Sequence, residues 1–282
     1  MKFEKQIEVV SPGTNLVDLV SQATDLSKQK TKAALSKGAV WLKTDTKTDN
    51  SVRRVRRADR RLDPGQIVYV YYDESILETK PPAATLLTDE DNYSIWHKPY
   101  GMLSQGSKWG DHCTLSRWAE KHLQPQRPAF TVHRLDRAAS GLMVIAHSKK
   151  VAAALAEQFQ QRKVEKRYRA LVKGQLVEPL TIDQDIDGQS ALTEVTPLEY
   201  SQKRNISLVD VGIKTGRKHQ IRKHLSQANF PILGDRLYDP DIKDDDQDLC
   251  LVAHYLAFHC PTTGERKTYS LPESLIPTIS LA

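Results

Sequence analysis

The chain has 282 residues, of which 39% are hydrophobic and 27% are charged, and its formal net charge is +6. These values are ordinary for a folded globular protein and exclude a disordered chain. No apolar run approaches the length of about 18 residues that a transmembrane helix requires. The N-terminus lacks the apolar stretch of a signal peptide and the three cysteines are scattered, so we expect a cytoplasmic protein without a disulfide framework.

The first 74 residues are predicted to form a small α/β domain. Two of its segments carry apolar residues at helical spacing, and two others have the composition of strands. The predicted helices cover residues 15–25 and 27–38, and the predicted strands cover residues 39–43 and 62–73.

A basic run, RRVRRADRR at residues 53–61, lies within this domain. It contains six arginines, which are Arg53, Arg54, Arg56, Arg57, Arg60 and Arg61. A solvated surface is one interpretation of such a run. Binding of nucleic acid is favoured, because arginine dominates over lysine and its planar guanidinium suits phosphate.

A linker is expected over residues 75–92, since Pro81 and Pro82 interrupt both the helical and the strand periodicity. Residues 93–282 are predicted to form a second, larger domain. Its predicted strands cover residues 93–101, 142–146, 166–174, 193–201, 206–213 and 251–259, its predicted helices cover 151–164 and 217–229, and 239–248 is an expected acidic loop. Strands outnumber helices without strict alternation, so we expect an α+β fold with a mixed, largely antiparallel sheet.

The sequence HRLD at residues 133–136 places a carboxylate beside arginine at the entrance of an apolar strand. Tyr168 lies on another predicted strand, between Arg167 and Arg169. A salt-bridged strand end and a core tyrosine are the ordinary interpretations of these two features. Spacing alone therefore names no reaction.

The predicted helix over residues 217–229 follows the glycine turn KTG and begins with basic residues. His219 and Arg222 are three residues apart and are expected to share one helical face. The helix N-terminus would also attract a phosphate, although a solvated basic helix is the alternative. The sequence PILGD at 231–235 is predicted to be a short turn.

Three motifs that point to other functions are rejected. HRLD is similar to the HRD of protein kinases, but the chain lacks their glycine-rich loop and DFG. SKQK and KTG imitate motifs of penicillin-binding enzymes, but the SDN that should accompany them is missing. The cysteines and histidines between residues 250 and 260 match no common zinc spacing, so no metal site is expected.

Four segments resemble the signature of the RluA-type RNA pseudouridine synthases (the RsuA/RluA family). They are HRLDRAASGLMVIAHS, KRYRALVKG, KTGRKHQIRKHL with NFPILGD, and AHYLAFHCPTTGE. They keep the family's order over about residues 93–270. Residues 1–74 look like the S-four RNA-binding module that often precedes this catalytic domain, with a looser match.

The resemblance implies an isomerase that converts uridine in RNA to pseudouridine without a metal, nucleotide or redox cofactor. Asp136 would be the nucleophile, Tyr168 would lie against the target base and Arg222 would pair with the aspartate. An adjacent arginine would keep the carboxylate ionised in a water-poor pocket. The target nucleotide would have to be flipped out of its stack before it could react.

RNA is the expected partner, with ribosomal RNA favoured over transfer RNA, and neither a membrane nor an obligatory protein partner is implied. The residues expected to contact RNA are His133, Arg134, Arg217, His219 and the six arginines of the basic run. Phosphate contacts of this kind bring affinity without choosing the sequence.

The chain departs from the family at Ala139, where a threonine is usual, so a hydrogen bond that supports the loop of the aspartate is expected to be missing. A rival hypothesis is an RNA-binding protein with a relic catalytic domain that acts in ribosome assembly or RNA folding. The presence of Asp136, Tyr168 and Arg222 together favours the enzyme.

Overall fold

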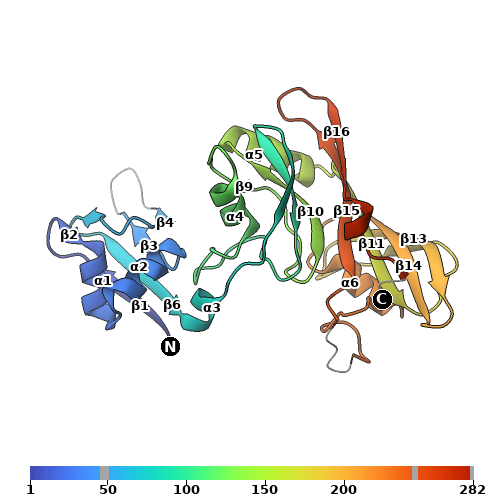
Figure 1. Cartoon of the computed structure of the whole chain (residues 1–282), viewed down its shortest axis with the longest axis horizontal. Coiled ribbons are helices and arrows are strands. Elements are labelled where there is room, and N and C mark those ends of the chain that lie inside the picture. The colour runs from blue at the N-terminus through green and yellow to red at the C-terminus, as the bar shows by residue number, and fades with distance from the viewer. Residues whose placement is uncertain (45–50, 243–246, 280–282) are drawn as a thin grey trace. The chain divides into compact units, whose positions relative to one another are not determined.

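The computed structural model describes residues 1–44, 51–242 and 247–279. The chain divides into two compact units (Figure 1). Unit 1 comprises residues 1–81 and 105–118, and unit 2 comprises residues 82–104 and 119–282. Residues 105–118, which the sequence prediction assigns to the second domain, thus group with unit 1.

Unit 1 contains a four-stranded antiparallel sheet with the strand order β1-β6-β3-β4. These strands are β1 (Lys2–Glu8), β3 (Val40–Lys43), β4 (Val52–Arg54) and β6 (Ile67–Asp73). A short pair joins β2 (Thr14–Asn15) to β5 (Arg61–Leu62), and the helices are α1 (Leu16–Thr24), α2 (Lys28–Ser36) and α3 (Glu74–Glu78).

The core of unit 1 follows from the predicted periodicities. Val68 and Val70 alternate along β6 on the buried face, and Leu16 and Val20 lie one helical turn apart on the buried side of α1. The two predicted helices and two predicted strands are confirmed. The sequence prediction missed β1, because its lysines and glutamates conceal an alternation in which only Ile7 is buried.

The prediction of a linker over residues 75–92 was wrong for two of its parts. The helix α3 ends at Glu78, and the strand β7 (Thr85–Asp89) pairs with β8 (Tyr93–Lys98) as an antiparallel hairpin. Asp91 adopts a positive φ of 59° in the connecting turn. The prolines that suggested a linker lie just before this strand, where they do not interfere with its hydrogen bonds.

Unit 2 is organised around a ten-stranded sheet with the order β12-β13-β14-β11-β15-β10-β8-β7, to which β16 and β9 add at the side (Figure 1). Its further strands are β9 (Phe130–Thr131), β10 (Ser140–Ala146), β11 (Glu165–Lys173), β12 (Leu180–Asp183), β13 (Leu192–Ser201), β14 (Ile206–Ile213), β15 (Leu251–His259) and β16 (Arg266–Ser270). Strands β10 and β15 run parallel, and the other strand pairs in the described part of the chain are antiparallel. The expected α+β class with a mixed, largely antiparallel sheet is therefore confirmed.

Unit 2 also contains the helices α5 (Lys149–Gln160) and α6 (Gln220–Gln227) and a 3₁₀ turn at Glu273–Leu275. Helix α4 (Leu115–His122) begins in the segment assigned to unit 1 and ends in the segment assigned to unit 2. Helix α5 begins at the cap residue Ser148, whose hydroxyl accepts a hydrogen bond from the backbone of Val151. Its Leu155 packs into the same buried cluster as Leu142 and Val144 of β10. No helix in the described residues is long and apolar enough to cross a membrane.

One cross-strand row links the three central strands of unit 2. Gly141 of β10 lies opposite Ala253 of β15, and Ala253 lies opposite Tyr168 of β11. Gly141 has a φ of +122°, and a Cβ added there would lie 2.4 Å from both the backbone nitrogen and the carbonyl oxygen of Ala253. Only glycine therefore allows β10 to approach β15 at this point.

Replacing Gly141 by alanine is expected to destabilise unit 2 strongly, because both the backbone conformation and the close approach to Ala253 oppose a methyl group. Gly188 is the matched control, since its φ is +73° and nothing lies within 4 Å of an added Cβ. In urea unfolding, Gly188→Ala should cost about 1–2 kcal/mol and Gly141→Ala clearly more. Equal losses would contradict the steric explanation.

Candidate active site

Asp136 lies in the loop between β9 and β10, and neighbouring backbone fixes that loop. The buried hydroxyl of Ser104 donates to the carbonyl of Leu135 (2.7 Å) and accepts from its N–H (3.0 Å). The N–H of Gly101 donates to the carbonyl of Arg137 (2.8 Å). Both backbone neighbours of Asp136 are thus held by the segment that follows β8.

Lys98, the last residue of β8, is fully buried beneath this loop. Its ammonium donates to the carbonyls of Pro99 and Met102, both at 3.0 Å. Burial lowers the pKa of Lys98 to about 7, and the nearby charge of Asp136 opposes this shift. Lys98 is therefore an amine near Asp136 whose charged form is destabilised by burial.

Tyr168 comes from β11, at the point where the pairing of β11 with β15 is irregular. The register shifts between Arg167 and Tyr168, so that His254 has no direct partner on β11. Such bulges redirect side chains and are common beside functional sites. Tyr168 lines the same cleft as Asp136 and is 8% exposed. Burial, followed by the charge of Asp136, raises the pKa of Tyr168, so its phenol is neutral at physiological pH.

The flanking arginines, Arg167 and Arg169, do not line this cleft. Both form ion pairs with the buried carboxylate of Asp210, which also accepts a hydrogen bond from His254 (2.8 Å). Successive residues of a strand point to opposite faces of the sheet. Tyr168 therefore lines the cleft, whereas Arg167 and Arg169 contact Asp210 on the other face.

Helix α6 begins at Gln220, three residues later than predicted. His219 precedes it with a φ of +56°, a left-handed conformation that most side chains avoid. Buried Gln220 fixes this start, because its amide donates to the carbonyl of Leu192 (2.9 Å) and accepts from the hydroxyl of Thr215 (2.7 Å). His219 and Arg222 therefore do not share a helical face, and the expectation that they do was wrong.

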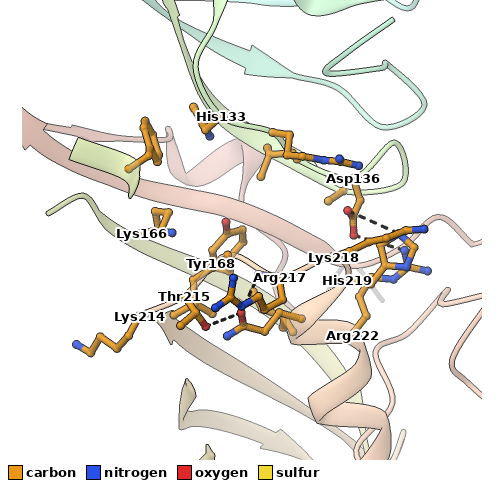
Figure 2. Close-up of a pocket in the computed structure, with 18 of the residues that line it drawn as sticks. His133, Asp136, Lys166, Tyr168, Lys214, Thr215, Arg217, Lys218, His219 and Arg222 are labelled. Atoms are coloured by element: carbon orange, nitrogen blue, oxygen red, sulfur yellow. Dashed lines mark hydrogen bonds and ion pairs between the residues drawn. The ribbon is translucent and has the colours of Figure 1, made fainter. Parts of the chain in front are cut away.

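Arg222 of α6 stands between two carboxylates. Its Nε and Nη2 donate to Asp235 at 2.8 and 2.6 Å, and its Nη1 lies 3.5 Å from Oδ2 of Asp136. Arg222 is 4% exposed and Asp235 is 1% exposed, whereas the Asp136 side chain keeps 18% of its surface exposed. Asp235 thus orients the guanidinium, whose remaining donor faces the accessible aspartate (Figure 2).

His219 approaches Asp136 from the same side as Arg222 (Figure 2). Its Nε2 lies 3.8 Å from Oδ1 of Asp136, and its Nδ1 lies 2.8 Å from the hydroxyl of Tyr238. Burial lowers the pKa of His219, while the charge of Asp136 partly opposes this shift. The aspartate therefore faces an arginine and an imidazole, with neither at short hydrogen-bond distance.

A cleft of about 580 Å³ extends from Asp136 past Tyr168 to helix α5. In Figure 2, Asp136 lies at one end of the drawn side chains, and Lys166 and Lys214 lie toward the other. The cleft is strongly basic, with cationic side chains from Arg134, Arg162, Lys166, Lys214, Arg217, Lys218 and Arg222. Such an arrangement suits a polyanion that carries a polar ring.

The structure brings together the residues predicted for unit 2. Arg134, Arg217 and His219 line this cleft with Asp136, Tyr168 and Arg222. His133 also lines it, but its ring stacks on Phe159 at 4.4 Å and its Nε2 accepts the N–H of Val144 (3.1 Å). Burial, with a smaller effect of Lys166, lowers the pKa of His133 to about 3, so this imidazole is uncharged.

The arginines of the basic run lie in unit 1 and divide into two groups. Arg54 and Arg56 form ion pairs with Asp111 and donate to the carbonyls of Gly38 and Ser36, respectively. Arg53, Arg57, Arg60 and Arg61 are exposed. Two of the six arginines therefore share one carboxylate and bind backbone carbonyls inside unit 1.

The sequence reasoning missed Asp235, Lys98 and Tyr238. Asp235 lies in the predicted turn PILGD, where a carboxylate after glycine in an otherwise apolar segment is the signal for a functional side chain. Ala139 is buried and its N–H donates to the carbonyl of Asp136 (3.2 Å). A backbone hydrogen bond from Ala139 thus supports the loop, although alanine lacks the hydroxyl of the threonine that is usual at this position.

Asp235→Asn is expected to lower the free energy of unfolding by about 3–5 kcal/mol, because it leaves the buried charge of Arg222 without its main partner. The double variant with Arg222→Met should lose less than the sum of the two single variants. Asp187→Asn is the matched control, since its pair with Lys223 is exposed and should contribute less than about 1 kcal/mol. Additive losses in urea unfolding would contradict this coupling.

Lys98 should also make stability depend on pH. Its pKa of about 7 in the folded chain lies below the ordinary value of 10.5, so between these values the unfolded chain binds the extra proton. Raising the pH in this range should stabilise the wild type by up to about 1.4 kcal/mol per unit relative to Lys98→Met. The exposed Lys163→Met is the control in urea unfolding. Parallel pH profiles for wild type and Lys98→Met would contradict the lowered pKa.

Comparisons with known proteins identify the family. A profile described as RNA pseudouridylate synthase matches residues 92–227. An uncharacterised RNA pseudouridine synthase of Aquifex aeolicus is 31% identical over 283 residues, covering 88% of this chain and 86% of its own. The dual-specificity RNA pseudouridine synthase RluA of Escherichia coli K12 is 33% identical over 208 residues, covering 68% and 94%.

A solved structure, human RNA pseudouridylate synthase domain containing 1, shares the fold. It has a TM-score of 0.60 and 23% identity, and the alignment covers 71% of this chain and 88% of the human one. The sequence relatives carry the family assignment, since their identity exceeds 30% over most of their own length. The chain belongs to the RluA-type RNA pseudouridine synthases, which isomerise uridine in RNA to pseudouridine.

Proposed function

We propose that Asp136 is the nucleophile of this isomerisation and that Tyr168 and Arg222 complete the catalytic site. One observation carries the proposal. The Asp136 carboxylate is partly exposed at the end of a basic cleft, with Nη1 of Arg222 at 3.5 Å and Tyr168 in the same cleft. A carboxylate that is accessible and has a fixed cationic neighbour suits covalent catalysis.

The reaction breaks the bond between the ribose C1′ and N1 of uracil and forms a bond from C1′ to C5. The proton on C5 leaves, and N1 regains a proton, so the product is an isomer of the substrate. Carboxylates serve as nucleophiles in other glycosyl-transferring enzymes. Arg222 places a cation 3.5 Å from the Asp136 carboxylate, and Asp235 keeps that cation in place.

Tyr168 is proposed to hold the target base. Its neutral phenol and buried ring suit stacking, which contributes about 1–3 kcal/mol per base. This gain offsets part of the few kcal/mol that flipping the nucleotide costs. The phenol of Tyr168 already carries a proton. It can therefore accept the proton from C5 only if it passes its own proton to another group at the same time.

The basic side chains of the cleft are proposed to bind the RNA backbone. Arg134 and Arg217 belong to this set, and His133 contributes its ring rather than a charge. In unit 1, Arg53, Arg57, Arg60 and Arg61 are exposed and suit phosphate contacts. Arg54 and Arg56 would support this surface through Asp111.

The substrate is proposed to be structured RNA, with ribosomal RNA favoured over transfer RNA. Residues 1–74 would form the S-four-like RNA-binding module and residues 93–282 the catalytic domain. The helix pair and basic run of unit 1 support the first assignment, and the family match over residues 92–227 supports the second. A cytoplasmic location fits three cysteines that are reduced thiols, which a reducing compartment preserves.

The alternative is a relic domain that binds RNA without modifying it. The presence of Asp136, Arg222 and Tyr168 in one cleft favours the enzyme. A protein that only binds RNA does not require a partly exposed carboxylate in a basic cleft. That carboxylate opposes phosphate binding.

Asp136→Asn is expected to abolish pseudouridine formation while RNA affinity changes only a few-fold, because asparagine keeps the shape of the side chain but not its charge. Pseudouridine should be mapped across total RNA from cells with the gene intact, deleted or carrying this variant. A site lost equally in the deletion and in the variant is the expected result, and it identifies the substrate as well.

Asp187→Asn, at an exposed carboxylate, is the control and should retain every site. If no site is lost in the deletion while the purified protein still binds RNA, the relic-domain alternative holds.

A further inference from the structure

A second cleft of about 210 Å³ meets the larger one at Asp136. The two clefts share Asp136, His219 and Arg222, but they differ in the rest of their lining. The larger cleft continues to Tyr168, whereas the smaller one is formed with the turns at Tyr100 and at Leu237. The nucleophile therefore stands at a junction, and the smaller cleft is not used in the proposed chemistry.

The lining of the smaller cleft combines apolar and cationic side chains. Leu237 is 66% exposed, and Tyr100 accepts a hydrogen bond from Nη1 of Arg236 at 2.9 Å. Arg137 adds a second exposed guanidinium. An exposed leucine by itself is ordinary, but here it lies in a concave site beside an aromatic ring and two cations.

The position of Leu237 is linked to the active site. Oδ1 of Asp235 accepts the N–H of Leu237 at 3.1 Å and also binds Nη2 of Arg222. One buried carboxylate thus fixes both the cation beside Asp136 and the turn that presents the leucine. This contact involves only the backbone of Leu237, and the leucine side chain itself remains exposed in the smaller cleft.

We infer that the smaller cleft binds the nucleotide next to the target uridine, with its base against Leu237 and Tyr100 and its phosphate near Arg137 and Arg236. The inference rests on the proposed function, because it needs the target uridine to lie at Asp136. A neighbouring nucleotide is one backbone step away and so reaches an adjoining cleft. Unstacked bases of RNA are bound by this combination of apolar or aromatic surfaces and guanidinium groups.

The test is a coupling experiment between Leu237 and the neighbouring base. The probe is a short stem-loop RNA that contains the uridine identified by mapping, together with two versions that lack the base on its 5′ or its 3′ side. Initial rates give kcat and KM for the full-length wild type and for Leu237→Ala. The variant removes side-chain atoms only, so the hydrogen bond from residue 237 to Asp235 is retained.

With the intact RNA, Leu237→Ala should raise KM by about tenfold, as expected when apolar contact to a bound base is lost. Removing one neighbouring base should raise the KM of the wild type by a similar factor, while Leu237→Ala shows no further increase with that RNA. Leu198→Ala is the matched control, since Leu198 is 48% exposed on β13 outside both clefts. It should keep the wild-type KM with all three RNAs.

The inference is overturned if the effects of Leu237→Ala and of base removal multiply for both neighbours, or if Leu198→Ala raises KM as much as Leu237→Ala. An unchanged KM for Leu237→Ala with the intact RNA overturns it too. These results leave the proposed function standing as long as Asp136→Asn abolishes the modification. If Asp136→Asn still forms pseudouridine, the proposed function itself fails.

Discussion

The buried ion pair between Arg222 and Asp235 is the interaction on which the site depends. A guanidinium with 4% exposure is unstable without a partner, and Asp235 provides two hydrogen bonds to it. Because two of its nitrogens are occupied, the third faces Asp136. Asp235 thus fixes the guanidinium of Arg222 beside the accessible carboxylate of Asp136.

The loop of Asp136 is held on its other side by backbone contacts. Ser104 binds both polar groups of Leu135, and Gly101 binds Arg137. The aspartate side chain itself makes no short hydrogen bond to His219 or Arg222, which lie 3.8 and 3.5 Å away. Hydrogen bonds hold the backbone on both sides of Asp136 while its carboxylate stays accessible, which fits the proposed role as a nucleophile.

Charge in this protein is used in two ways. The cationic side chains of the cleft are gathered from separate segments and face a common space, which suits a polyanionic substrate. In unit 1, by contrast, Arg54 and Arg56 are turned toward Asp111 and backbone carbonyls. A run of arginines is therefore not a uniform surface, and its members differ in how far they are exposed to solvent.

The sequence predicts the α+β class, most of the strands of unit 2 and two strands of unit 1, β3 and β6, and it singles out Asp136, Tyr168 and Arg222 as candidate residues. The strands are local features, because their alternation is visible within a few residues. The roles expected of the three side chains follow from the family resemblance and not from the local pattern. Tertiary structure decided which carboxylate Arg222 binds, that β10 pairs in parallel with β15, and that two clefts meet at Asp136. Such pairings join segments that are far apart in the chain, and local periodicity does not record which distant group neutralises a charge or covers a strand.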